Sequence, residues 1–501
     1  MSKLKEKIAE KKEFIVTFES VPGRGYGGGN VEEAIEFGEK IISSKLPVHA
    51  ISITDNPGGN PAISPDVLAR ELHSIGIEAL VHFACNNSNR NMIESRAYAL
   101  ARSGIENLLV ITGDYPVGGY NGMAKPIFDL DSVQTIRYLK DMNKGLEIPG
   151  RKKGTFDKLS ETNFFVGCAV SPFKKTEAEL MTQFFKLEKK ILAGADFIIP
   201  QLGYDVRKFA EIVKYMKYRN INTPIMGNVY VLNRPVARFM NKGHIHGCIV
   251  TDELVRKIEE EANAPDKGKD ASLKRAAQLM AIFRGLKFNG VHIGGFGLKF
   301  EDLEYIIKQA EEMENNWREY IPNFRYNQED EYYCFSEEGN ALAAPPSPKS
   351  QSLNFQVSKF CHHFVFTKEA PAYKTVKCIY ELLEKWKFAG DICHFFERQI
   401  KRLLFDCQEC GDCAIFDLAY LCPMSKCAKF QRNGPCGGSK NGMCEANDTK
   451  RCVWTLAYDR FSSTDNLDYL RREYIPPVDC SLSKTSSWAN FFMGRDHTGK
   501  K

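Results

Sequence analysis

The sequence predicts an α/β protein in which a (β/α)8 TIM barrel is followed by a small cysteine-rich metal-binding domain with helices. Short apolar runs alternate with longer amphipathic segments from residue 13 to about 293, which is the pattern of strands separated by helices. Eight of the sixteen cysteines fall between Cys407 and Cys452. Between these two patterns the composition becomes that of a linker. We therefore expect a barrel over residues 1–320, a linker over 321–355 and a cysteine-rich domain over 356–501.

The overall composition is that of an ordinary globular protein. The 501 residues are 43% hydrophobic and 26% charged with a net charge of +5, which gives no reason to expect nucleic acid or a membrane surface as a partner. Residues 1–12 are a charged amphipathic run without the apolar centre of a signal peptide, and no stretch is apolar over the length of a membrane span. Half of the cysteines are scattered singly, which favours reduced cysteines and a cytoplasmic location.

Eight short apolar runs are the candidate strands. They are apolar throughout, as in a parallel sheet that helices cover on both faces. The segments between them include Val31–Ser44, Pro65–Ser74 and Glu177–Ala193, whose apolar residues recur at three and four. Eight such units in about 290 residues suit a barrel, with a doubly wound sheet as the alternative. The runs are Phe14–Phe18, Ala50–Ile53, Ala79–Ala84, Asn107–Ile111, Phe164–Val170, Asp196–Ile199, Pro224–Met226 and Gly290–Ile293.

One motif favours the doubly wound alternative. The segment from Gly23 to Gly28 satisfies G-x-G-x-x-G, and Asp55 closes the second predicted strand, as in a dinucleotide-binding fingerprint. However, this stretch is glycine-rich at nearly every position, and Pro22 stands where the strand should turn into a phosphate loop. We therefore interpret the segment as a loop over the mouth of a barrel.

Polar residues stand where the predicted strands end. In a barrel these positions meet on one face, and in barrel enzymes that face carries the chemistry. Each residue alone has an ordinary explanation, such as a helix cap or a hydrogen-bonded core histidine. Their shared placement nevertheless predicts a functional site. The residues are Glu19, Thr54, His82, Asp114, Gln201 and Asn228.

The chain after the eighth run is expected to be mostly helical before it reaches the cysteines. A helix is predicted over Phe300 to Asn316, and two more over residues 371–405, where an apolar stripe from Val376 to Trp386 is interpreted as packing surface. The tail after about Ser481 is polar, and we expect it to be partly disordered.

The cysteine-rich stretch reads C-x2-C-x2-C-x8-C-P-x3-C-x8-C-G-G-x5-C-x7-C. Thiolates at C-x2-C spacing can reach one centre, and a proline after the fourth cysteine is typical of iron–sulfur ligand runs. Four-cysteine zinc sites use the same spacings, and metal-free buried cysteine is the third reading. Eight thiolates suffice for two four-cysteine sites. The predicted metal ligands are Cys407, Cys410, Cys413, Cys422, Cys427, Cys436, Cys444 and Cys452.

The first 315 or so residues resemble the methylenetetrahydrofolate reductase family. The motifs that carry the resemblance are Thr17-Phe-Glu19-Ser-Val-Pro22, Thr54, His82, Ile111-Thr-Gly113-Asp114 and Ala193-Gly-Ala-Asp-Phe-Ile-Ile-Pro-Gln201. The resemblance implies a barrel that holds FMN at the carboxyl ends of its strands. The cysteine-rich segment resembles the small partner domain that accompanies such reductases in acetogenic and other anaerobic bacteria. It implies [4Fe–4S] clusters or, alternatively, zinc.

The resemblance also implies roles for individual residues. Glu19 would be the general acid that protonates N10 of methylenetetrahydrofolate, helped by a pKa that an apolar surrounding raises. Asp114 would stabilise the cationic iminium. Gln201 would contact the folate and is distinct from Gln183 on the preceding helix. The flavin-contacting positions would be Thr54, His82, Thr112, Gly113, Asp114 and Lys190, the last beside the FMN phosphate.

Three departures from the family pattern bear on the electron donor. The chain has Ser20-Val-Pro22-Gly23 where many relatives have Phe-Phe-Pro-Pro, Thr112 where they have arginine, and Asn233-Arg-Pro235 where an aromatic is expected. We therefore expect ferredoxin or another electron-transfer protein as the donor, with NAD(P)H as the alternative. A flavin-free folate or pterin methyltransferase and an electron-transfer or scaffold subunit are the competing functions. Homo- or hetero-oligomerisation stays open.

Overall fold

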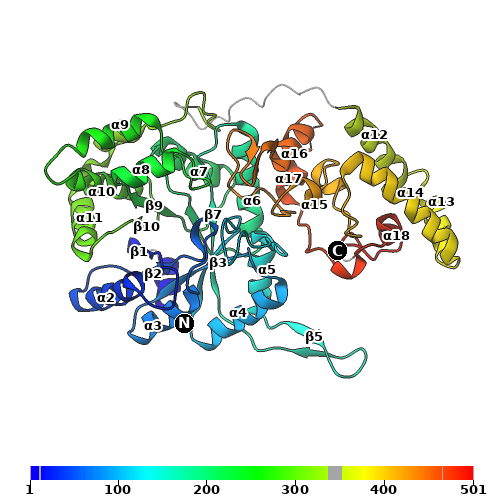
Figure 1. The fold of residues 1–501 in the computed structure, drawn as a ribbon, viewed down its shortest axis with the longest axis horizontal. Helices are drawn as coiled ribbons and strands as arrows, with labels where there is room; N and C mark the ends of the chain where they lie inside the picture. The colour runs from blue at the N-terminus through cyan, green and yellow to red at the C-terminus, as the bar shows by residue number, and fades with distance from the viewer. Residues whose placement is uncertain (1, 11–12, 337–351, 465, 500–501) are drawn as a thin grey trace.

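The computed structural model describes residues 2–10, 13–336, 352–464 and 466–499. Eight parallel strands form one sheet in the order β8-β7-β4-β3-β2-β1-β10-β9, and a bridge between Ile198 and Ile225 joins its two ends. This closes the (β/α)8 barrel that the sequence predicts (Figure 1). The barrel strands are β1 (Ile15–Ser20), β2 (Ala50–Ile53), β3 (Ala79–Ala84), β4 (Asn107–Ile111), β7 (Phe165–Val170), β8 (Phe197–Pro200), β9 (Met226–Val231) and β10 (Gly290–Gly295).

Helices cover the outside of the barrel. Side chains such as Asn89, Asp131 and Thr176 accept hydrogen bonds from backbone N–H groups of the first turn and so fix where three of these helices begin. The helices of this part are α2 (Gly29–Ser44), α3 (Pro65–Ser74), α4 (Arg90–Arg102), α5 (Ser132–Met142), α6 (Glu177–Leu192), α7 (Val206–Tyr218), α8 (Arg234–Asn241), α9 (Asp252–Glu261), α10 (Lys269–Gly285) and α11 (Phe300–Met313). A short hairpin of β5 (Glu147–Pro149) and β6 (Phe156–Lys158) adds to the predicted elements.

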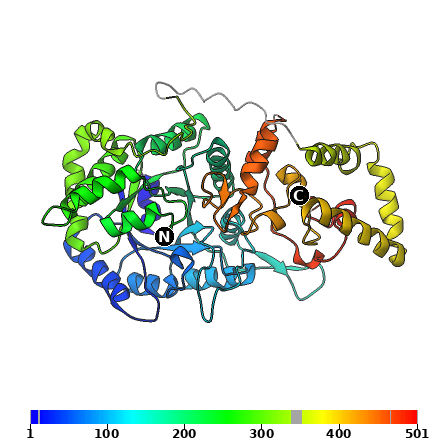
Figure 2. The same ribbon diagram turned by 45° about the horizontal axis from the view of Figure 1, so that its top comes forward.

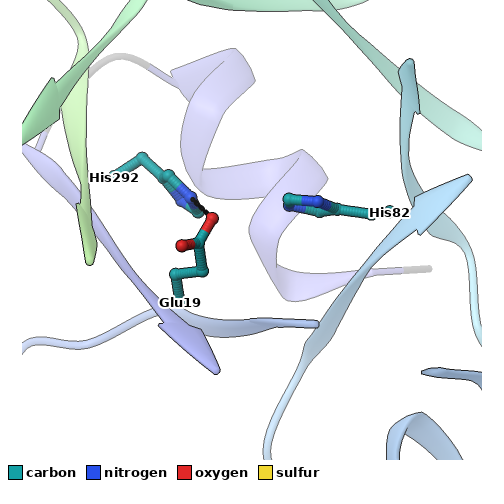
Figure 3. A group of neighbouring side chains, drawn as sticks. All are labelled: Glu19, His82 and His292. Atoms are coloured by element: carbon teal, nitrogen blue, oxygen red, sulfur yellow. Dashed lines mark hydrogen bonds and ion pairs between the residues drawn. The ribbon is translucent and has the colours of Figure 1, made fainter. Parts of the chain in front are cut away.

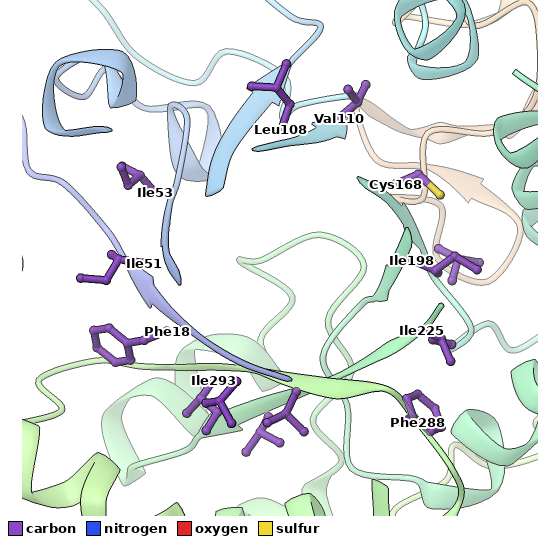
Figure 4. Close-up of a cluster of buried hydrophobic side chains, with 14 of the residues drawn as sticks. Phe18, Ile51, Ile53, Leu108, Val110, Cys168, Ile198, Ile225, Phe288 and Ile293 are labelled. Carbon is purple, nitrogen blue, oxygen red and sulfur yellow. The ribbon is translucent and has the colours of Figure 1, made fainter. Parts of the chain in front are cut away.

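Alternate residues of each strand face the helices or the barrel interior. The outward residues, among them Phe18, Ile51 and Ile293, pack against the helices in the main core (Figure 4). The inward residues form two layers. The layer at the amino ends of the strands is apolar and includes Leu80 and Phe197, while the layer at the carboxyl ends is polar. The amino end is closed by helix α1 (Lys3–Glu10), whose Leu4 and Ile8 are buried in this apolar layer.

The C-terminal region packs against the barrel through helix α6. Ala178 and Phe185 of α6 join a second core with side chains such as Trp454 and Leu470, and α16 and α17 lie beside α6 in both views (Figures 1 and 2). The elements of this region are α12 (Leu353–Cys361), α13 (Tyr373–Leu383), α14 (Lys387–Phe405), α15 (Pro423–Lys426), β11 (Met443–Cys444), β12 (Asn447–Arg451), α16 (Val453–Ser462), α17 (Leu467–Arg472) and α18 (Ser487–Phe492).

Two predictions about the C-terminal region are wrong. The tail after Ser481 is ordered over most of its length: it forms α18, and His497 is buried between two aspartates. The apolar stripe predicted as packing surface is largely exposed, because α13 and α14 extend away from the rest of the chain (Figure 1). Helix α14 has charged side chains on its buried face and apolar ones on its exposed face: Glu397 and Lys401 are buried, whereas Phe396 is exposed.

Part of the predicted linker, residues 321–355, belongs to the described part of the chain. Phe324, Tyr326, Cys334 and Phe335 are buried against the barrel helices, so the chain up to residue 336 packs with the barrel. Residues 337–351 lie outside the described residues. The division into domains at 320 and 355 stays a prediction. No described helix is both long enough and apolar enough to cross a membrane.

Candidate active site and metal-binding cysteines

The barrel mouth brings together Glu19 of β1, His82 of β3 and His292 of β10 (Figure 3). Nε2 of His292 lies 3.2 Å from Oε2 of Glu19, and one side-chain nitrogen or oxygen of each of the three residues lies within 4.8 Å of the others. The parallel pairing of β1 with β10 sets Thr17 opposite His292, so the inward side chains of the two strands meet. The predicted convergence of Glu19 and His82 therefore occurs, and it includes His292 as well.

Hydroxyl groups from the same layer hold both imidazole rings. Oγ1 of Thr17 lies 2.9 Å from Nδ1 of His292, and Oγ of Ser52 lies 2.9 Å from Nε2 of His82. A hydrogen bond to one ring nitrogen fixes the orientation of the ring and leaves the other nitrogen for a partner. For His292 that other partner is the carboxyl of Glu19.

The expected rise in the pKa of Glu19 is not found. Burial by itself raises the pKa of this carboxyl, but the hydrogen bond from His292 and the nearby imidazoles lower it by more, so the net pKa lies below the ordinary value. Burial lowers the pKa of His82 to about 4. The sequence argument failed because it treated the barrel mouth as apolar and did not include His292.

This arrangement offers two kinds of chemistry. One carboxylate and two imidazoles form a donor set that suits a divalent transition metal. The same Glu19–His292 hydrogen bond also forms a proton-sharing pair, which suits general acid catalysis at a substrate bound in the mouth.

The turn after β4 lies at the same end of the barrel as this triad. Gly113 has a φ of 82°, which a side chain rarely adopts, and an added Cβ would lie 2.4 Å from Oδ1 of Asn86. Oδ2 of Asp114 accepts a hydrogen bond of 2.8 Å from the backbone N–H of Gly58. The loops after β2 and β4 are therefore tied together over the end of β3.

One of the predicted flavin-contacting residues, Thr54, fits a polar cofactor. The Thr54 hydroxyl is buried and finds no hydrogen-bond partner among the described residues, and such groups usually have one. A flavin presents carbonyl oxygens and ring nitrogens along one edge, and these atoms could form the hydrogen bond that the Thr54 hydroxyl lacks. Thr112 is buried at the end of β4. Nζ of Lys190 donates 2.6 Å to the carbonyl of Ala169, and burial lowers the pKa of this lysine to about 8.

The remaining strand-end residues are engaged with the backbone. Oε1 of Gln201 accepts from the N–H of Leu202 at 2.9 Å, and Nδ2 of Asn228 donates to the carbonyl of Pro200 at 3.2 Å. Gln201 follows β8, whereas Gln183 is buried within α6, as expected.

The dinucleotide-binding motif is not formed. The fold is a closed barrel, and Gly23 to Gly28 lie in a largely exposed loop before α2. The carboxylate of Asp55 pairs with Arg96 at 2.7 Å. This aspartate therefore anchors α4 to the sheet.

The eight clustered cysteines fall into two groups of four. Cys407, Cys410, Cys413 and Cys422 line one pocket, and Nζ of Lys401 lies 3.4 Å from Sγ of Cys413. We call these the first cysteine group. The second cysteine group is Cys427, Cys436, Cys444 and Cys452, which lie close enough to perturb one another's ionisation. The grouping follows the order of the cysteines in the chain: the first four form one group and the last four form the other.

The distances between the sulfur atoms and the pKa values of the thiols bear on how these groups could bind a metal. Within the described part of the chain no three cysteine sulfurs lie within 4.8 Å of one another, whereas thiolates on one zinc ion would lie about 3.8 Å apart, given Zn–S bonds of about 2.3 Å. Burial raises the pKa of Cys410 and of Cys436 to about 12, so a bound metal would have to displace protons from these thiols.

The segment that carries the second cysteine group lies against the barrel mouth. Nζ of Lys174 donates to the carbonyls of Gly437 and Ser439 at 2.5 and 2.6 Å. Nζ of Lys186 donates 2.8 Å to Oε1 of Gln431, and Nζ of Lys429 donates 2.8 Å to the carbonyl of Gly113. Buried lysines therefore join the two parts of the chain on both sides of this interface.

Sequence reasoning missed several of these residues. His292 could have been found, because it is a polar residue within the otherwise apolar run Gly290–Ile293. The buried lysines Lys174, Lys186 and Lys429 gave no such signal, because lysine on a helix or in a loop is usually exposed.

These features define the class of protein: a (β/α)8 barrel with a polar site at the carboxyl ends of its strands and a cysteine-rich C-terminal region. Residues 3–310 match the family model described as methylenetetrahydrofolate reductase, and residues 389–481 match the one described as methylene-tetrahydrofolate reductase C terminal. The chain belongs to the methylenetetrahydrofolate reductase family.

Curated relatives agree with this assignment at modest identity. The chain is 28% identical over 198 residues to methylenetetrahydrofolate reductase 2 of Saccharomyces cerevisiae, covering 38% of this chain and 30% of that one. It is 26% identical over 277 residues to methylenetetrahydrofolate reductase (NADH) 1 of Arabidopsis thaliana, covering 53% and 42%. The chain thus spans less than half the length of these relatives. A Clostridium thermocellum structure, titled as binding two copies of 5-methyl-5,6,7,8-tetrahydrofolic acid, aligns over 62% of this chain and 99% of its own, with 16% identity and a TM-score of 0.44.

Proposed function

We propose that this chain reduces 5,10-methylenetetrahydrofolate to 5-methyltetrahydrofolate with two electrons and two protons, and that FMN is its cofactor. The observation that carries the proposal is the Glu19–His292 pair at the mouth of a barrel of this family. Bound FMN would collect single electrons from the cysteine region and supply them to the folate as hydride. Thr54, His82 and the turn at Gly113 would hold the flavin.

Glu19 and His292 would supply the proton that opens the folate ring at N10. Because His292 lowers the pKa of Glu19, we assign the proton to the pair rather than to an isolated, desolvated carboxyl. The hydroxyl of Thr17 fixes the ring of His292, which keeps Nε2 directed at the carboxyl. Asp114, on the turn at the same end of the barrel as the triad, would stabilise the cationic methylene iminium by its negative charge.

The cysteine groups would bring electrons to the barrel. The second cysteine group would be the nearer of the two, because its segment contacts the turn at Gly113 through Lys429. Iron–sulfur clusters pass one electron at a time, which suits a ferredoxin-type donor. NAD(P)H reaching the mouth directly is the alternative, and zinc in the cysteine groups would then be structural.

The first test is the composition of anaerobically purified protein. We expect about one FMN per chain with iron and acid-labile sulfide, and faster reduction by low-potential ferredoxin than by NADH. Zinc without iron would contradict the cluster route. A colourless protein that binds folate would favour a flavin-free methyltransferase instead.

The second test separates a catalytic barrel from a scaffold. Glu19→Gln removes the proton donor and should lower turnover of methylenetetrahydrofolate by about 10²- to 10⁴-fold, while reduction of the bound flavin by the donor continues. Glu33→Gln, at an exposed position of α2, is the matched control. Unchanged turnover in Glu19→Gln would contradict the assignment.

A further inference from the structure

Lys429 occupies an unusual place for a lysine. It belongs to the segment of the second cysteine group, is only 4% exposed, and its ammonium donates 2.8 Å to the carbonyl of Gly113 in the barrel. It also lies over the ring of Phe128 and forms an ion pair with the buried carboxylate of Glu445. A buried cation is costly unless it is paired and hydrogen-bonded, and both conditions are met here.

The turn that Lys429 contacts carries no cation of its own. It reads Thr112-Gly-Asp, and Thr112 is buried and uncharged. The side chain of Lys429 reaches the same turn from a distant part of the chain. The C-terminal region thus provides a positive charge where the barrel sequence has none.

The partner of Lys429 faces the other way, toward the cysteines. Oε1 of Glu445 lies 3.7 Å from Sγ of Cys436, a member of the second cysteine group. Gly113, Lys429, Glu445 and Cys436 therefore form a continuous chain of contacts from the barrel mouth to the predicted metal site. Asn86 donates 2.8 Å to the backbone carbonyl of Asp114, so the turn is also held from the barrel side.

We propose that Lys429 is a positioning residue that supplies the positive charge at the Gly113–Asp114 turn, and that Glu445 holds its ammonium there. This inference rests on the proposed function, because the charge acts on a flavin bound at that turn. A cation beside the flavin stabilises its reduced, negatively charged form, so Lys429 sets both the affinity for FMN and the potential at which it is reduced. The C-terminal region is then part of the flavin site and not only a route for electrons.

The test compares charge-changing variants of the whole chain. Lys429→Met keeps an unbranched side chain without charge and should weaken FMN binding by at least about tenfold, the effect of one charge-assisted contact, with a flavin midpoint potential that is more negative. Glu445→Gln leaves Lys429 uncompensated and should move the potential in the opposite direction. Lys450→Met, at an exposed position in β12, is the control and should change neither quantity.

A rescue variant separates charge from structure. Thr112→Arg in the Lys429→Met background returns a cation to the turn and should restore much of the FMN affinity and potential. If Lys429→Met fails to fold, Glu445→Gln decides alone, and a flavin potential that stays at the wild-type value would overturn the inference. Flavin affinity and potential that stay at wild-type values in both Lys429→Met and Glu445→Gln would overturn this inference while leaving the proposed function intact. A wild-type chain that binds no FMN would overturn both.

Discussion

The buried histidine of the tail should make the stability of the cysteine-rich region depend on pH. Nδ1 of His497 lies 2.5 Å from Oδ1 of Asp412, and its Nε2 lies 3.1 Å from Oδ2 of Asp417. Burial opposes the charge of the ring, but these two carboxylates outweigh it and raise the pKa of His497 to about 9. The folded chain therefore binds this proton more tightly than the unfolded chain does.

The sign and size of the effect follow from linkage. A pKa raised from 6.5 to about 9 corresponds to about 3 kcal/mol, since one unit is about 1.4 kcal/mol. This stabilisation is fully present below pH 6.5, falls as the pH rises, and is lost above about pH 9. Replacing His497 by glutamine removes the titrating group, so the variant should lose this pH dependence and be less stable at low pH, where the two aspartates lose the imidazolium that bridges them.

Urea unfolding followed by tryptophan fluorescence measures this directly. Trp386, Trp454 and Trp488 lie in the C-terminal region, so the signal reports mainly on that part. The wild-type free energy of unfolding should fall across the pH window, whereas the His497→Gln profile should be flat by comparison. His73→Gln, at an exposed position of α3, should behave as wild type. An identical pH dependence in wild type and His497→Gln would refute the reasoning.

Two further predictions concern the turn and the cysteine groups. Gly113→Ala forces a side chain into a left-handed backbone and against Asn86, so it should destabilise the turn by about 2 to 5 kcal/mol and lower the flavin content. The control is Gly118→Ala, where an added Cβ meets nothing within 4 Å and the flavin content should not change. Equal flavin content in both variants would contradict the expectation. Cys422→Ser and Cys436→Ser should each remove the metal of one group only, measured as metal per chain, and a single substitution that empties both groups would refute the division.

Much of the barrel could be predicted because its strands are buried on both faces. Eight runs that are apolar throughout are typical of parallel strands with helices between them. Every run overlaps a strand of the closed sheet, although Pro224–Met226 shares only Met226 with β9. Glu19 could be identified because a polar residue at the end of such a run stands out. His82 and His292 both lie inside a run, but only His82 belongs to the family motifs, and His292 escaped notice.

The sequence by itself determined the local pattern: the periods of strands and helices, the family motifs and the cluster of eight cysteines. It could not divide those cysteines, because C-x2-C spacings are compatible with several groupings. Only the tertiary structure decided which four come together. It also placed Lys429 on the carbonyl of Gly113, 316 residues away, and buried His497 between two aspartates. Contacts between distant segments depend on how both segments pack, and no local sequence pattern encodes those contacts.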